Sequence, residues 1–485
     1  MARRGRIRRS RWTAISEHCP VAVVLSAVLT VTLFAGYVVG DLYDVLPGVL
    51  TLHPMRVPTV PSAREVITGD GLVTAAGQGT SIDATAAQHL IDVFAASDGV
   101  GDDFSIVIAD ADGTVIASRD ADIVREPAST MKTLTSLAAS KVLDLSTTLD
   151  TETYLMQSKG DIPTLVLKGN GDMLLGTGNN DPDHVNGRAG LGTLADQTVD
   201  ALRQRGITQI RLLYDDSLFG EQRYPANIEQ NNGGHLYYAP ISSMAVDGGR
   251  DWEGDPPDDP DVYTGYPELS TQPAVDAAAA FAAMLSDRGI LLKDSPSAGL
   301  APEDMSPLTS VSSAQLSEIM AFMLRHSDNT LAEEFGRLVA LASGYENSPS
   351  GATQAVTDSL RNMGIATDSL TMADCSGLSP GSRLDARILI DVQAAALSGG
   401  SGSAVVEGMS VPGLSGTASD RLDDETMAGL LRVKTGTLDA VTAMTGNVSR
   451  MNGGVLCFAI VVNQPENAWE AARAVDVFIS DLPEL

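Results

Sequence analysis

Apolar and polar residues alternate with two different periods along this chain, and the periods predict its strands and helices. Residues 104–110 and 114–118 are short apolar runs separated by Asp112-Gly113, the pattern of a β-hairpin. The other predicted elements are helices at about 127–145, 275–285, within 316–341 and at 466–482, and strands at 431–437, 441–448 and 455–463. Together they predict an α+β body, an antiparallel sheet flanked by helices.

The segment from about 148 to 290 differs from the rest in composition and pattern, with short predicted strands, many Gly and Asn residues and acid-rich loops. It interrupts the body, so we expect an inserted domain there. Its loop at 251–261 lacks the regular ligand spacing of a calcium-binding loop, which favours a solvated loop. The predicted divisions are a basic stub at 1–20, an anchor at 21–40, a linker at 41–80, the body at 81–147 and 291–485, and the inserted domain at 148–290.

Residues Val21–Gly40 form a run of twenty residues without a charged side chain. A helix of this length spans about 30 Å, the thickness of a bilayer core. Six arginines precede the run, so the positive-inside rule predicts a single-pass helix with a cytoplasmic N-terminus and an extracellular body. The alternative is a cleaved signal, although the apolar region of a signal is normally shorter.

The charge of the chain excludes one class of partner. Among 485 residues, 62 are acidic and 32 basic, for a net charge of −30. Residues 1–19 have a net charge of +5, so the rest of the chain has −35 and repels polyanions, which excludes a nucleic-acid partner held by bulk charge. Three cysteines are too few for a disulfide framework or a Cys-rich zinc site, and no metal or cofactor is predicted. Pairing of Cys375 with Cys457 is left open.

Ser129-Thr130-Met131-Lys132 is an S-x-x-K sequence at the start of a predicted helix. Residues three apart share a helix face, so the lysine amine can take the serine proton if neighbouring cations and partial burial lower its pKa. The alternative for this common short pattern is an ordinary exposed lysine. Only six residues of the chain are lysines, which makes a lysine within a motif more informative.

Ser327-Asp328-Asn329 is an S-x-N sequence in the predicted break between two helices. The serine hydroxyl can relay a proton between a lysine and a leaving group, and the asparagine amide can hold both the lysine and a substrate backbone. Helix capping is the structural alternative, because Ser, Asp and Asn are preferred N-caps. The two roles are compatible.

Lys434-Thr435-Gly436 is a K-T-G sequence on the first of the three predicted C-terminal strands. The lysine would supply positive charge, the threonine hydroxyl could bind a carboxylate, and the glycine would let a substrate strand approach. The backbone N–H of Thr437 is a candidate oxyanion donor. The alternative is a solvated edge strand protected by its lysine.

The three motifs occur once each, in an order that resembles the penicillin-binding proteins and serine β-lactamases. The sequence around the three motifs resembles that of the D-alanyl-D-alanine carboxypeptidase/endopeptidase family known as peptidase family S13, the penicillin-binding protein 4 type. The matching stretches are EPASTMKTLT (126–135), GNGDMLL (169–175), YDDSLF (214–219), YYAPISSMAVDGG (237–249), RHSDNTLAEE (325–334), DCSGLSPGSRLDA (374–386) and VKTGTLDAVTAMTGNV (433–448). The resemblance runs from about residue 85 to the C-terminus and implies a serine β-lactamase/DD-peptidase-like fold with an inserted domain between the first two motifs.

The resemblance also implies a reaction: an acyl-enzyme forms at the D-Ala-D-Ala bond of a peptidoglycan stem peptide and is then hydrolysed. The implied roles are nucleophile for Ser129, general base for Lys132, proton donor to the leaving D-alanine for Ser327, orienting amide for Asn329, carboxylate binding for Lys434 and Thr435, and an oxyanion hole from the N–H groups of Ser129 and Thr437, with Gly436 on the substrate-binding strand. Some family members also cut crosslinks as endopeptidases. β-Lactam antibiotics are the implied inhibitors, and no cofactor is implied.

Two stretches depart from the family pattern and put the fine-tuning of substrate recognition in doubt. Cys375 stands where the family usually has glycine, and residues 246–249 replace a more Asn-rich run. Residues 377–381 fit the G-x-S-x-G nucleophile elbow, but Pro380 follows the serine and has no N–H for an oxyanion hole, so we reject an elbow. A serine β-lactamase remains the enzymatic alternative, although no E-x-x-L-N stretch is present, and an inactive cell-wall-binding protein is the non-enzymatic one.

Overall fold

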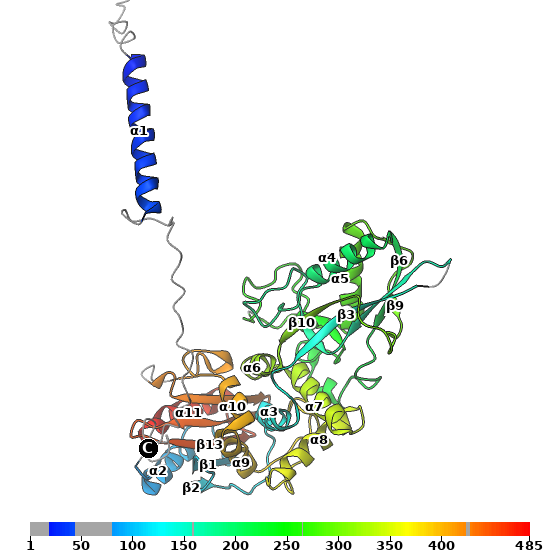
Figure 1. Ribbon diagram of the computed structural model, residues 1–485. Coiled ribbons are helices and arrows are strands. Elements are labelled where there is room, and N and C mark those ends of the chain that lie inside the picture. The colour runs from blue at the N-terminus through cyan, green and yellow to red at the C-terminus, as the bar shows by residue number, and fades with distance from the viewer. Residues whose placement is uncertain (1–18, 44–79, 158–159, 264, 423–426) are drawn as a thin grey trace, which may run out of the picture. The chain divides into compact units, whose positions relative to one another are not determined.

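The computed structural model describes residues 19–43, 80–157, 160–263, 265–422 and 427–485 (Figure 1). It consists of two compact units, Met1–Val73 and Thr74–Leu485. The predicted stub at 1–20 and linker at 41–80 lie almost wholly outside the described residues.

In the first unit, the described residues form helix α1 (Cys19–Leu42), which includes the apolar run predicted at 21–40. Within the ranges given above, no individual helix has the combined length and hydropathy of a membrane span. The apolar stretch of α1 is Val24–Val39, and one bent pair of helices, at 386–397 and 400–408, meets the criteria by length and composition alone.

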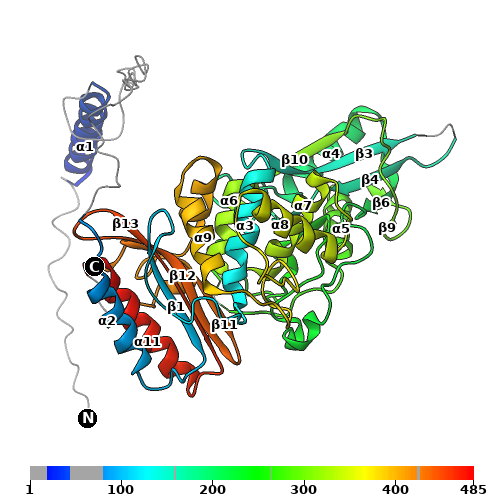
Figure 2. The same ribbon diagram turned by 90° about the horizontal axis from the view of Figure 1, so that it is seen from below.

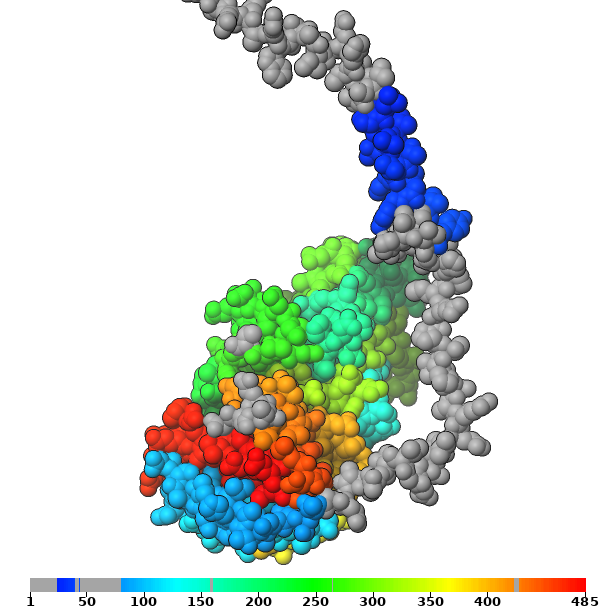
Figure 3. Space-filling view, turned by 90° about the vertical axis from the view of Figure 1, so that its left-hand side faces the viewer, coloured from blue at the N-terminus to red at the C-terminus, as the bar shows by residue number. Residues whose placement is uncertain are grey.

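The first sheet of the second unit joins strands from both ends of that unit. Its order is β11-β12-β13-β1-β2, and every neighbouring pair is antiparallel. Helices α2 and α11 lie side by side on one face (Figures 2 and 3), and α9 packs on the other face (Figure 2). These elements are β1 (Phe104–Asp110), β2 (Val115–Arg119), β11 (Leu431–Leu438), β12 (Val441–Ser449), β13 (Val455–Asn463), α2 (Ala84–Ala95), α9 (Ala386–Leu397) and α11 (Ala468–Asp481).

Strand β1 shows why this sheet is covered on both faces. Ile106 and Ile108 belong to the core under α2 and α11, whereas Val107 and Ala109 belong to the core on the opposite face. Successive side chains of a strand point to opposite faces, so the unbroken apolar run at 106–109 requires two covered faces.

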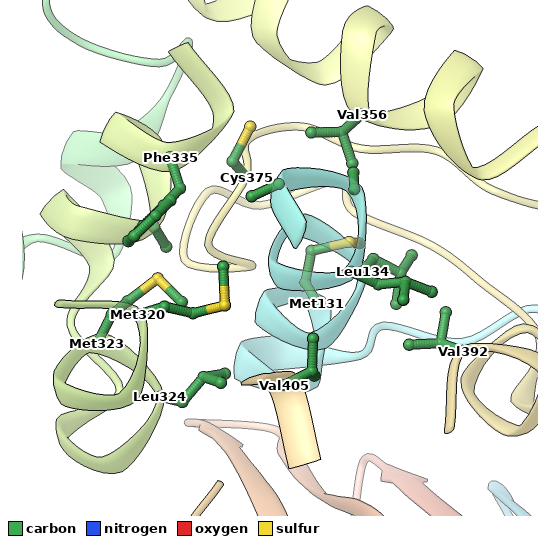
Figure 4. Packing of buried hydrophobic residues seen from close by; sticks show 14 of the residues in the cluster. Met131, Leu134, Met320, Met323, Leu324, Phe335, Val356, Cys375, Val392 and Val405 are labelled. Atoms are coloured by element: carbon green, nitrogen blue, oxygen red, sulfur yellow. The ribbon is translucent and has the colours of Figure 1, made fainter. Parts of the chain in front are cut away.

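A layer of helices packs against the sheet, with α3 at its centre. The helices are α3 (Met131–Val142), α6 (Leu316–His326), α7 (Asn329–Ser343), α8 (Pro349–Asn362) and α10 (Ser403–Gly408). Every residue of α3 from Met131 to Ser140 is buried. Figure 4 shows Met131 and Leu134 of α3 among side chains such as Met320, Phe335 and Val392 from α6, α7 and α9. Half of these ten buried residues are polar, namely Lys132, Thr133, Thr135, Ser136 and Ser140. Buried polar groups need hydrogen-bond partners inside the protein, and all but Ser136 have one.

A second sheet, with its own core, lies between the first two motifs in the sequence (Figure 1). Its order is β10-β3-β4-β6-β8, with β9 also pairing with β6, and it mixes antiparallel and parallel pairs. The elements are β3 (Thr148–Met156), β4 (Thr164–Gly169), β6 (Gln209–Asp215), β8 (Leu291–Leu292), β9 (Ser297–Ala298) and β10 (Thr309–Gln315), with helices α4 (Leu191–Gln204) and α5 (Pro273–Asp287). The short strands β5 (Asp172–Leu175) and β7 (Met244–Val246) pair separately.

The mixed α/β architecture and the elements predicted from periodicity are confirmed. Helices α2, α4, α8, α9 and α10 were missed, although α8 has a clear start signal: the Ser348 hydroxyl accepts from the N–H of Gly351, and Pro349 occupies the first helical turn. Cys375 and Cys457 are both buried and free, which answers the question of their pairing.

Candidate active site

The predicted nucleophile lies on a 3-10 turn, η1 (Ala128–Thr130), that leads directly into α3. Ala128 is fully buried and has a φ of +48°, a left-handed conformation that residues with a Cβ rarely adopt. The Ser129 side chain is partly exposed, while residues 128 and 130 on either side of it are buried. The turn therefore presents one hydroxyl at the edge of an otherwise closed core.

Lys132 is fully buried one turn further along, so the alternative of an ordinary exposed lysine is wrong. Its Nζ donates to three acceptors: Ser129 Oγ at 2.9 Å, Asn329 Oδ1 at 2.7 Å and the carbonyl oxygen of Ser376 at 2.9 Å. Three acceptors match the three N–H bonds of an ammonium group. The first two motifs are thus in direct contact across 197 residues of sequence.

The S-x-N motif occupies the junction of α6 and α7. Ser327 ends α6 with a φ of +56°, and Asp328 caps α7 by accepting from the N–H of Leu331. Asn329 begins α7, and its Nδ2 donates to the carbonyl oxygen of Tyr237 at 2.8 Å. The predicted N-cap is therefore present at Asp328, and it leaves the Ser327 and Asn329 side chains to face the two lysines.

Lys434 is also fully buried, so the alternative of a solvated edge strand is wrong. Its Nζ donates to Ser327 Oγ at 2.9 Å and to the carbonyl oxygen of Thr435 at 2.8 Å. Thr437, two residues beyond Thr435, is exposed. All three predicted motifs therefore meet at one site.

Position 436 requires glycine for a structural reason, in addition to the predicted approach of a substrate strand. A Cβ at this position would lie 2.8 Å from the carbonyl oxygen of Pro127 and 3.2 Å from the backbone nitrogen of Ser129. Strand β11 can pack against the nucleophile turn only because the side chain is missing.

The two buried lysines have lowered pKa values. Burial lowers the pKa of Lys132 to about 7, while the carboxylates of Asp374 and Asp328 act in the opposite direction. Burial, and then the charge of Lys132, place the pKa of Lys434 well below its ordinary value. The positive charge of Lys132 disfavours a second ammonium group at Lys434.

The loop at 374–379 completes the site, and sequence reasoning assigned it no role. The Asp374 carboxylate accepts from the N–H groups of Ser376, Gly377 and Ser379, at 2.9, 2.6 and 2.7 Å. This holds the Ser376 carbonyl toward Lys132 Nζ. The signal was present in the stretch DCSGLS, because an aspartate followed by small residues is typical of a turn built on its own side chain.

Cys375, the departure from the family pattern, is accommodated by a glycine on α7. A Cβ at Gly336 would lie 2.2 Å from Cys375 Sγ. The thiol fills the space that a side chain at position 336 would occupy. Burial raises the pKa of Cys375 well above its ordinary value, so the thiol is a packing group at neutral pH.

Arg250, from the acid-rich part of the second sheet's loops, holds the S-x-N motif from outside. Its Nη2 donates to Asp328 Oδ2 at 2.6 Å, and its guanidinium stacks 3.9 Å from the centre of the Tyr263 ring. Both partners are buried, at 8% and 7% exposure of the side chains. Burial raises the pKa of Asp328, but the charge of Arg250, the hydrogen bonds from Leu331 and Arg250 and the charge of Lys132 together outweigh it, so the pKa lies below its usual value.

A small cavity lies beside the motif, lined in part by Tyr237, Tyr263, His326, Ser327 and Asn329. Across the described part of the chain, no three His, Cys, Asp or Glu side chains are grouped so that they could hold a metal ion.

A serine hydroxyl next to a buried lysine of lowered pKa, on a mixed α/β fold, defines a serine hydrolase with a lysine in place of the usual histidine. The chain belongs to the D-Ala-D-Ala carboxypeptidase 3 (S13) family, whose model matches residues 87–252 and 267–482.

Individual relatives agree with this assignment. The carboxypeptidase DacB of Mycolicibacterium smegmatis is 35% identical over 393 residues, covering 77% of this chain and 79% of that one. A carboxypeptidase of Mycobacterium tuberculosis is 31% identical over 424 residues and covers 85% of each chain. Penicillin-binding protein 4 from Haemophilus influenzae has a similar fold, with a TM-score of 0.65 at 18% identity over 84% of this chain and all of that one.

Proposed function

We propose that this protein is a serine-type D-Ala-D-Ala carboxypeptidase that trims peptidoglycan stem peptides through an acyl-enzyme on Ser129. Membership of the S13 family supports the activity. The observation that carries the mechanism is the 2.9 Å contact between Lys132 Nζ and Ser129 Oγ inside a buried cluster.

The direction of proton transfer follows from the three acceptors around Lys132. A neutral amine has two N–H bonds and one lone pair, so one of the three hydrogen bonds must reverse when Lys132 loses its proton. The carbonyl oxygens of Asn329 and Ser376 have no hydrogen to give. Only the Ser129 hydroxyl can then donate to Nζ, which is the arrangement of a general base.

The reaction can be written with these groups. Ser129 Oγ bonds to the carbonyl carbon of the penultimate D-alanine as its proton passes to Lys132, and the C–N bond to the terminal D-alanine then breaks. Ser327, 2.9 Å from Lys434 Nζ, would relay a proton from the lysines to the leaving amine, giving its own hydrogen and regaining one from an ammonium group. Asn329 would orient the substrate, and the N–H groups of Ser129 and Thr437 would hold the oxyanion. Water then cleaves the ester and frees Ser129.

The K-T-G strand would bind the free carboxylate of the terminal D-alanine. Lys434 is buried beside this position and Thr435 contributes a hydroxyl, so the anion would exchange water for a charged and a neutral donor. This local charge is needed because the chain as a whole has a net charge of −30 and does not attract an anionic wall.

We also propose a location, an inhibitor class and a domain boundary for this protein. The uncharged run at 21–40 behind six arginines supports a membrane anchor with an extracellular body, with a cleaved signal as the alternative. The motif set supports binding of β-lactam antibiotics as inhibitors. The second sheet supports an inserted domain, whose proposed end moves from 290 to about 315 because β10 pairs with β3.

The proposal is tested by incubating the protein with a fluorescent penicillin and mapping the labelled peptide. We expect a persistent label on Ser129, its loss in Ser129→Ala, and release of D-alanine from a D-Ala-D-Ala peptide. Ser136→Ala is the matched control, because Ser136 is a buried serine of α3 whose hydroxyl has no hydrogen-bond partner. A label on another residue would overturn the mechanism. Rapid release of the label favours a β-lactamase, and absence of both label and cleavage favours a binding protein.

A further inference from the structure

A turn outside the three motifs reaches the proposed carboxylate-binding strand. Ser410 pairs with Val433 of β11 through two backbone hydrogen bonds, of 3.0 and 2.9 Å, on the edge of the strand that β12 does not use. Seven residues later, Thr417 lies in the 3-10 turn η6 (Gly416–Ala418). The segment 410–418 therefore covers part of the free edge of β11, next to Lys434 and Thr435.

The same turn is fixed to the helix that ends in the S-x-N motif. Gly416 has a φ of +74°, and a Cβ there would lie 2.3 Å from Ser410 Oγ and 3.1 Å from the carbonyl oxygen of Arg325. Arg325 lies in the last turn of α6, two residues before Ser327. The turn is thus packed between two of the three motifs, and the close approach leaves it little freedom.

Three hydroxyls form a row from this turn to the strand. Ser410 Oγ and Thr417 Oγ1 are 3.4 Å apart, and Thr417 Oγ1 and Thr435 Oγ1 are 2.7 Å apart. Each hydroxyl has one hydrogen to donate and two lone pairs to accept. A row of this kind can point all its hydrogens in one direction.

We propose that Thr417 is a positioning residue that sets the hydroxyl of Thr435 to donate to the substrate's terminal carboxylate. A carboxylate can only accept hydrogen bonds, so the Thr435 hydroxyl must donate its one hydrogen to the carboxylate. Thr435 Oγ1 is then free to accept from Thr417, and Thr417 from Ser410. Hydrogen bonds in such a row polarise one another, and the negative charge at its end strengthens the effect.

This inference rests on the proposed function and extends it to substrate selection. A substrate whose terminal carboxylate is replaced by an amide has no full negative charge to strengthen the aligned hydrogen bonds of the three hydroxyls. Loss of the Thr417 hydroxyl should therefore weaken recognition of free carboxylates much more than recognition of amides.

The test compares Thr417→Val, which removes the hydroxyl at nearly constant shape, with Thr417→Ser, which keeps it. Thr417→Ala is a second deletion that cannot overpack, and Ser419→Ala is an exposed control in the same turn. KM and kcat are measured for a D-Ala-D-Ala peptide and for its C-terminal amide. We expect Thr417→Val and Thr417→Ala to raise KM for the free carboxylate on the order of tenfold, with kcat and the amide substrate changed much less. Thr417→Ser and Ser419→Ala should resemble the original chain.

Equal loss on both substrates, equal loss in Thr417→Ser and Thr417→Val, or no loss at all would each overturn the role of Thr417. Failure of the unaltered chain to cleave either peptide refutes the proposed function itself, so the two failures are distinguishable.

Discussion

Gly377→Ala tests whether the nucleophile turn and the 374–379 loop must fit together for the site to work. The new Cβ would lie 1.9 Å from the carbonyl oxygen of Ala128, where real contacts do not fall below 3.0 Å, so the two segments must separate by at least about 1.1 Å. Ala128 precedes Ser129, and Ser376 supplies the carbonyl that accepts from Lys132. Whichever segment yields, the serine and its base are displaced relative to each other. A displacement of about 1 Å can cost about a hundredfold in rate.

The matched control is Gly381→Ala, two residues beyond the 374–379 loop. Gly377 and Gly381 have φ values of +83° and +107°, so both alanines incur backbone strain, but a Cβ at Gly381 has its nearest neighbour at 3.9 Å. The strain alone should lower the free energy of unfolding by about 1–2 kcal/mol.

The assay is the second-order rate of labelling by a fluorescent penicillin, with thermal unfolding measured on the same samples. We expect folded Gly377→Ala to label about a hundredfold more slowly than the original chain, and Gly381→Ala to label at nearly the original rate. Equal rates in the two folded variants would refute the reasoning, because only Gly377→Ala places a Cβ against the nucleophile turn.

Three further predictions concern the groups around the site. Acylation should accelerate as pH rises through about 7, because buried Lys132 accepts the serine proton only when neutral; a flat rate between pH 5 and 8, measured by labelling, contradicts this. Arg250→Met should lower the free energy of unfolding by about 3–5 kcal/mol, because the Asp328 carboxylate stays buried without its partner, and Arg250→Met with Asp328→Asn should lose less in denaturant titrations. Gly336→Ala should cost about 1–3 kcal/mol by crowding Cys375, and thermal unfolding should show a smaller cost in a Cys375→Gly background.

Local pattern was sufficient for much of the fold. The hairpin at 104–118 and the three C-terminal strands were predicted because apolar runs bounded by turn residues are a property of neighbouring positions. Helices α2, α4, α8, α9 and α10 were missed, and each of them is packed against other elements, as α9 is against β13. Tertiary packing, more than intrinsic propensity, stabilises helices of this length.

The sequence by itself determined which residues could do chemistry and that Ser129 and Lys132 would meet, because residues three apart on a helix share a face. Only the tertiary structure decided the environment of those residues. Whether Lys132 and Lys434 are exposed or buried depends on elements hundreds of residues away, and burial is what lowers their pKa values. The Ser376 carbonyl reaches Lys132 across 244 residues of sequence, in a contact that no local spacing encodes. The motifs name the reacting groups, and the packing of the chain around them determines their protonation and geometry.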